Sequence, residues 1–135
     1  MEMPADVRAD FDCRATAALL DTGGSLALAG HVAALVSLLS PGTAPWIKLC
    51  SALVWCAIVY GAMRVKMDSR FFELLASHPA EDFDRWLETT GLRKVAQPRT
   101  IPDRRRGALR LWRGLVIAVV IEILLMLVAV GRLLS

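Results

Sequence analysis

Three long segments of the chain carry almost no charge, and they constrain its fold more than any other feature. They run Gly23–Leu39, Pro45–Met63 and from about Ala108 to Gly131. A helix that spans a bilayer needs about 20 mainly apolar residues. Each segment therefore predicts one spanning helix, the first at the short end of that range. Between the first two, the sequence SPGTAP predicts a tight turn.

The composition agrees with this prediction. The 135 residues are 56% hydrophobic, too apolar for an ordinary globular domain that also carries 21% charged residues. The sequence predicts an all-α integral membrane protein with three transmembrane helices, an N-terminal amphipathic helix and a cytoplasmic helical loop. The predicted boundaries are 1–22 for the N-terminal segment, 23–40, 44–65 and 108–132 for the spans, and 66–107 for the loop.

The distribution of Lys and Arg predicts the orientation. The segment Arg64–Arg113 holds twelve basic and seven acidic residues, whereas the turn between the first two spans holds none. Because loops rich in Lys and Arg stay in the cytoplasm, the N-terminus is expected to be cytoplasmic and the C-terminus periplasmic. The Arg- and Ala-rich composition and the small size indicate a bacterial inner membrane.

The N-terminal segment predicts a short amphipathic helix. Its apolar residues recur at helical spacing: Val7, Phe11, Ala15, Ala18 and Leu19. Its acids, Asp6, Asp10 and Asp12, favour docking against the basic loop over binding to anionic lipid. The sequence DTGG, which starts at Asp21, is expected to break this helix and to cap the first span.

The loop predicts two helices and a linker. The first helix, DSRFFELLASH, has Asp68 or Ser69 as its expected N-cap. In the second, HPAEDFDRWLETTG, Phe83, Trp86 and Leu87 share one face and form a candidate docking surface. Such a helix pair cannot bury a core alone, so it is expected to pack on another surface. The sequence VAQPRTIPD is the predicted linker to the third span.

Arginines precede the third span and are candidates for binding a partner or lipid. They are Arg104, Arg105, Arg106, Arg110 and Arg113. Arginines that flank a span attract anionic headgroups. A nucleic-acid partner is not expected, because neither a folded reader nor interleaved aromatic residues accompany the basic run.

Two ionisable residues lie well inside the predicted spans, His31 in the first and Glu122 in the third. Such residues are costly in hydrocarbon and usually face a partner or a water-filled space. Each lies eight residues from the start of its apolar run, about 12 Å from the inner membrane edge. The equal depth predicts that the two side chains meet directly or through water. The alternatives are separate hydrogen bonds, with Glu122 a neutral acid, or a proton or ion route.

Small residues surround His31. Ala27, Gly30 and Ala34 form a track that lets another backbone come close, within the chain or between copies. The three cysteines, Cys13, Cys50 and Cys56, are expected to be small buried hydrophobic residues, and no spacing indicates a metal site. No catalytic motif is present.

These observations favour a non-catalytic small subunit or scaffold of an inner-membrane protein assembly. It would dock a larger partner through its transmembrane helices and its basic loop, with anionic lipids around it, and it would need no cofactor. The alternative is a self-assembling, holin-like channel or a proton- or ion-conducting protein that uses His31 and Glu122. In that case the partners are further copies of the chain.

Overall fold

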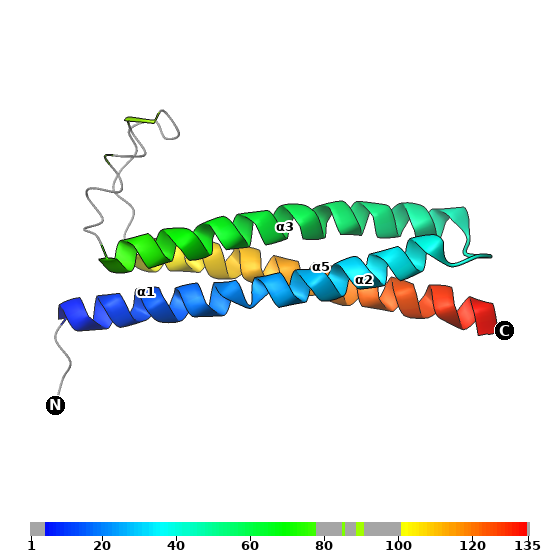
Figure 1. The fold of residues 1–135 in the computed structure, drawn as a ribbon, viewed down its shortest axis with the longest axis horizontal. Coiled ribbons are helices and arrows are strands. Elements are labelled where there is room, and N and C mark those ends of the chain that lie inside the picture. Colours follow the sequence, from blue (N-terminus) through cyan, green and yellow to red (C-terminus); the bar gives the residue numbers. More distant parts are fainter. Residues whose placement is uncertain (1–4, 78–84, 86–88, 91–100, 135) are drawn as a thin grey trace.

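The computed structural model describes residues 5–77, 85, 89–90 and 101–134. In these ranges the chain forms four long helices, α1 (Ala5–Asp21), α2 (Gly23–Leu39), α3 (Pro45–Ser77) and α5 (Ile101–Leu134). Figure 1 shows them side by side in an elongated bundle, with α3 antiparallel to α2 and α5. The start of α1 and the end of α5 lie at opposite ends of the bundle.

The helices α1 and α2 follow one another almost without interruption (Figure 1). Only Thr22 separates them, and its φ of −61° and ψ of −20° are helical. The expected break at DTGG is thus confined to one residue, and the predicted cap is wrong. Thr22 holds the N-cap position without a side-chain cap, since its hydroxyl donates to the Leu19 carbonyl, and Asp21 binds Lys66 of α3 instead.

Three helical stretches are long and apolar enough to cross a membrane: Asp10–Leu39, Pro45–Ala76 and Pro102–Leu133. The chain is therefore all-helical and compatible with a multi-pass membrane protein. The predicted turn joins the first two stretches, and Gly42 within it has a φ of +77°, which glycine adopts without strain.

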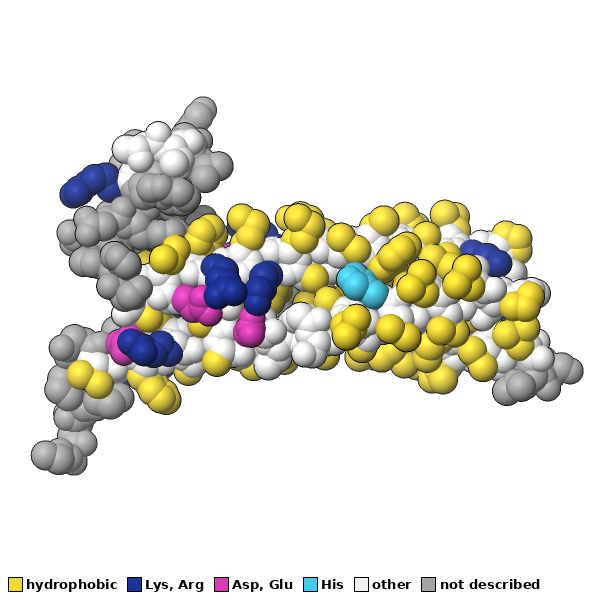
Figure 2. Space-filling view, viewed as in Figure 1, with side chains coloured by type: hydrophobic (Ala, Val, Ile, Leu, Met, Phe, Trp, Pro, Cys, Tyr) yellow, Lys and Arg dark blue, Asp and Glu magenta, His cyan; other side chains and the backbone are white. Residues whose placement is uncertain are grey.

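These helices are longer than a bilayer requires. The 33 residues of α3 extend about 50 Å, against a hydrocarbon thickness of about 30 Å. Figure 2 shows the surplus, because most charged side chains gather at one end of the bundle and hydrophobic ones cover most of the remaining surface. We call the charged end, residues 5–21, 64–77 and 101–113, the stalk. The remainder, residues 23–39, 45–63 and 114–134, is the apolar bundle.

The stalk includes residues that the sequence assigned to a loop. The helix start predicted at Asp68 or Ser69 is wrong, because α3 continues through both to Ser77. The Ser69 hydroxyl does not cap a helix but donates to the Ala17 carbonyl of α1 at 3.2 Å. Pro102, predicted in a linker, lies in the first turn of α5, where its missing N–H costs nothing.

The buried face of α1 is not the predicted one. The five apolar residues of the predicted stripe, Val7 to Leu19, are exposed. The residues that pack in the stalk core are Cys13, Ala17 and Leu20. Small side chains let α1 lie close to α3, where they meet larger core residues such as Phe72.

The acids of α1 meet the basic residues of the stalk in part as predicted. Asp12 lies 3.6 Å from Arg105 of α5, whereas Asp10 pairs with Arg14 of its own helix at 3.0 Å. These pairs are exposed, so they orient α1 more than they stabilise it. Among the cysteines only Cys13 is buried, and the expected burial of Cys50 and Cys56 is wrong, since both are exposed.

Small residues bring α2 close to both of its neighbours. Ala27, Gly30 and Ala34 are all buried. A Cβ at Gly30 would lie 2.9 Å from Ile58 Cδ1 of α3 and 3.1 Å from Val119 Cγ2 of α5. The structure thus uses the predicted small-residue track for contacts within one chain.

A larger residue at Gly30 should destabilise the packing of α2 against α3 and α5. Gly30→Leu is expected to lower the free energy of unfolding by roughly 1–3 kcal/mol, because Ile58 and Val119 must move. Gly24→Leu is the matched control, since a Cβ at Gly24 meets nothing within 4 Å. Reversible unfolding in mixed micelles measures the free energy of unfolding of both variants. Equal decreases in the two variants would contradict the packing described.

Candidate functional site

Glu122 lies at the centre of a polar cluster inside the apolar bundle. Its side chain is 0% exposed, and its Oε1 accepts a hydrogen bond from the Ser51 hydroxyl of α3. Ser37 of α2 is also fully buried and lies beside the carboxyl group without a hydrogen bond of normal geometry to it. We call Ser37, Ser51 and Glu122 the polar cluster. Each of the three membrane-length segments contributes one member.

The helical register explains why these residues meet. Each lies seven residues along its helix from a residue in the packed interior: Ser37 from Gly30, Ser51 from Ile58, and Glu122 from Leu115. Residues seven apart point to nearly the same side of a helix. The polar cluster therefore occupies core positions that would otherwise hold apolar side chains.

The hydrogen bonds of the polar cluster are incomplete. Ser37 Oγ and Glu122 Oε2 are buried without a hydrogen bond of normal geometry to the described residues. No described Lys, Arg or His is paired with the carboxyl group. Hydroxyl groups alone do not compensate a buried charge, so this environment fits a neutral, hydrogen-bonding acid.

His31 has a different partner, Trp55 of α3. The indole Nε1–H donates to His31 Nδ1 at 3.0 Å, and the rings meet edge to face with centroids 6.3 Å apart. An indole N–H only donates, so Nδ1 must be without its proton. The imidazole in this arrangement is neutral and carries its proton on Nε2.

The structure does not bring His31 and Glu122 into direct contact. No hydrogen bond or ion pair joins them within the described ranges, and each has its own partner on α3. Ser51 precedes Trp55 by four residues, so the two contacts lie about one helical turn, or 6 Å, apart along the bundle. An approach through water stays a prediction.

The five candidate arginines lie on α5 in the stalk, and they differ in their surroundings. Arg105 contacts Asp12, and Arg106 lies 3.4 Å from Asp103 of its own helix. Arg104 is half-buried. Arg110 and Arg113 are exposed and form no ion pair with a described residue. The predicted docking residues Phe83, Trp86 and Leu87 lie outside the described residues.

Sequence reasoning missed Ser37, Ser51 and Trp55 as partners. The serines lie within the apolar segments and belong to no catalytic motif. A signal was present in the seven-residue spacing of each serine from a residue of the bundle interior. Nothing comparable marks Trp55, because its position beside His31 depends on how α2 and α3 are rotated against each other.

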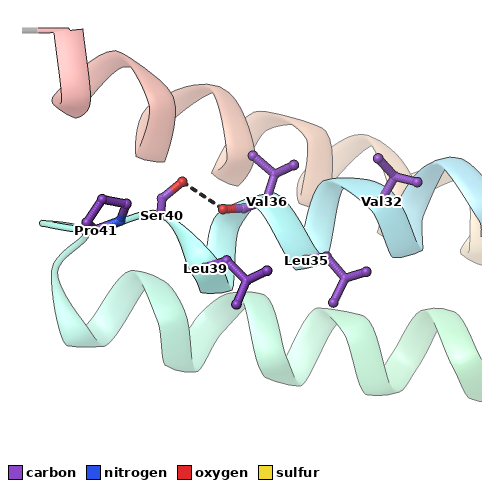
Figure 3. A pocket seen from close by; sticks show the side chains of 6 residues that line it. All are labelled: Val32, Leu35, Val36, Leu39, Ser40 and Pro41. Atoms are coloured by element: carbon purple, nitrogen blue, oxygen red, sulfur yellow. Dashed lines mark hydrogen bonds between the residues drawn. The ribbon is translucent and has the colours of Figure 1, made fainter.

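Other features of the described ranges offer no chemistry. No group of three or more His, Cys, Asp or Glu residues there could hold a metal ion. A shallow depression of about 410 Å³ lies near the end of α2, lined by aliphatic side chains with Ser40 and Pro41. Figure 3 shows these side chains. The Ser40 hydroxyl donates to the Val36 carbonyl at 2.7 Å and is not available to a ligand as a donor.

Comparisons of the chain with models of protein families, with curated proteins and with solved structures give no match.

Replacing Glu122 tests whether it acts as a neutral hydrogen-bonding group. Glu122→Gln keeps an acceptor for Ser51 and adds a donor, so its effect on unfolding is expected to stay within about 0.5 kcal/mol. Glu122→Leu leaves the buried Ser51 hydroxyl without its acceptor and should cost about 1–3 kcal/mol. Unfolding in micelles at neutral pH compares the two, and a Gln variant as unstable as the Leu variant would contradict a neutral acid.

Double-mutant cycles test the two separate contacts. The pair His31→Phe and Trp55→Phe should be non-additive by at least about 0.5 kcal/mol, because the residues share a hydrogen bond. The costs of His31→Phe and Glu122→Leu should add within about 0.5 kcal/mol, as expected of residues without direct contact. Strong coupling between His31 and Glu122 in the second cycle would instead support the direct or water-mediated pairing predicted from the sequence.

Proposed function

We propose that the protein is a non-catalytic small subunit or scaffold of a bacterial inner-membrane assembly, with its N-terminus and stalk in the cytoplasm. One observation carries the proposal: three membrane-length helical segments continue without a hinge from the apolar bundle into the stalk. A partner that binds the stalk is therefore held at a fixed height and rotation relative to partners in the membrane.

The polar cluster supports this function over that of a channel. Glu122 is fully buried among helices of its own chain, and Ser51 occupies its Oε1. Copies that pack side by side would meet the outer surfaces of the bundle and would not reach this carboxyl group. A holin-like pore or a proton route through Glu122 would require the helices of each copy to separate.

The charged surface of the stalk supports docking on the cytoplasmic side. Arg110 and Arg113 lie on the same side of α5 as Ile117, which is exposed in the apolar bundle. At a spacing of three and four residues they follow Ile117 out of the hydrocarbon and into the headgroup layer. There they would attract anionic lipid headgroups or an acidic surface of a partner.

Isolation of the complex in native-lipid nanodiscs tests the proposal. We expect the chain to be recovered with one or more unlike subunits at a fixed ratio, measured by native mass spectrometry. The combined change Arg110→Glu and Arg113→Glu should lower that ratio at least several-fold, whereas the matched Arg110→Lys and Arg113→Lys change should keep it. A symmetric assembly of this chain alone would refute the scaffold and favour the channel.

A further inference from the structure

His31 presents an N–H group that no described residue of its own chain uses. Trp55 occupies Nδ1, so the proton is on Nε2. No described residue accepts a hydrogen bond from Nε2, and this atom is not among the buried unpaired polar atoms. The imidazole is half-exposed, and Figure 2 shows the histidine colour at the surface, bordered by hydrophobic side chains.

This donor lies on the outer surface of the apolar bundle, far from its charged end. Gly23 packs against Val65 and Leu115, so the apolar segments of the three helices start at a common level there. His31 is eight residues beyond Gly23, about 12 Å along a helix, and half of the hydrocarbon thickness is about 15 Å. If the bundle spans a bilayer as proposed, neither water nor lipid headgroups reach this depth.

The surface around His31 is aliphatic. Leu28 and Leu35 lie one turn away on either side along α2, with exposed fractions of 65% and 46%. Hydrocarbon contact suits these side chains, but it leaves the Nε2–H without an acceptor. An unsatisfied polar group in hydrocarbon is strongly unfavourable, so this face needs an occupant with a suitably placed oxygen.

A second copy of the chain is poorly matched to this requirement. In a two-fold contact centred on this face, each copy would bring the same Nε2–H, and both Nδ1 atoms are already occupied. Two donors would then face one another. Hydrogen-bond complementarity therefore favours an unlike chain.

We propose that the face of α2 and α3 around His31 is the docking site for a membrane helix of an unlike subunit. That helix presents a hydroxyl, amide or carboxyl oxygen that accepts the hydrogen bond from His31 Nε2–H at mid-membrane depth. This inference rests on the proposed scaffold function and specifies where within the membrane the partner binds.

Site-specific photocrosslinking in native-lipid membranes tests the site. A benzophenone side chain at position 28 should give one adduct, and its mass should equal this chain plus one unlike subunit. A benzophenone at position 124 is the matched control, since Leu124 is 56% exposed on α5. Position 124 should give at least tenfold less of that adduct.

Variants of His31 test the hydrogen bond itself. His31→Phe keeps a ring but removes the N–H and should reduce the adduct from position 28 at least tenfold. His31→Gln keeps an N–H donor and should retain most of it. Unfolding in micelles establishes whether both variants are folded. If His31→Phe does not fold, the adduct yields of His31→Gln and His31→Leu are compared in its place.

Each contrary result has a distinct meaning. An adduct that persists without the N–H, or one with the mass of two copies of this chain, would overturn the inference. An adduct from position 124 and not from position 28 would mean that the partner binds another face of the bundle. That result would overturn the inference about His31 but not the scaffold function. Absence of any unlike subunit from the native-lipid preparation would refute the scaffold function as well.

Discussion

The close approach of α2 to its two neighbours is the contact on which the rest of the apolar bundle depends. Gly23 and Gly30 place the backbone of α2 directly against Val65, Ile58 and Val119. Larger residues there would hold the helices apart by the width of a side chain. At that separation the short side chains of Ser37 and Ser51 would not reach the Glu122 carboxyl group, and its burial would lose its compensation.

The stalk is held together differently. Its ion pairs are exposed and contribute little, so its cohesion comes from apolar contacts and from the buried hydrogen bond between Ser69 and the Ala17 carbonyl. In the apolar bundle, the Ser51 hydroxyl of α3 bonds to the Glu122 side chain of α5, whereas in the stalk the Ser69 hydroxyl bonds to backbone. One set of continuous helices therefore carries two kinds of core, one with a buried side-chain polar cluster and one held mainly by apolar contacts.

Residue order alone predicts the spans and the turn, because the length of an apolar run and the place of Pro and Gly are local properties. It fails at the end of the second span, since Arg64 begins the charged part of α3 and the helix continues to Ser77. It also fails for His31 and Glu122. Counting residues gives a depth to within about a turn, but the choice of Trp55 and Ser51 as partners depends on helix rotation. The buried face of α1 was missed because Cys13 and Ala17 are weak hydrophobic signals.

The two ends of the bundle differ in how freely the chain could change during evolution. At one end, residues 40–44 join α2 to α3, and Gly42 needs its positive φ. An insertion there would disturb the register that aligns Gly30 with Ile58. At the other end, α3 stops at Ser77 and α5 starts at Ile101, both in the stalk. Lengthening either helix at that end would extend the stalk and leave the contacts of Gly30 with Ile58 and Val119 unchanged.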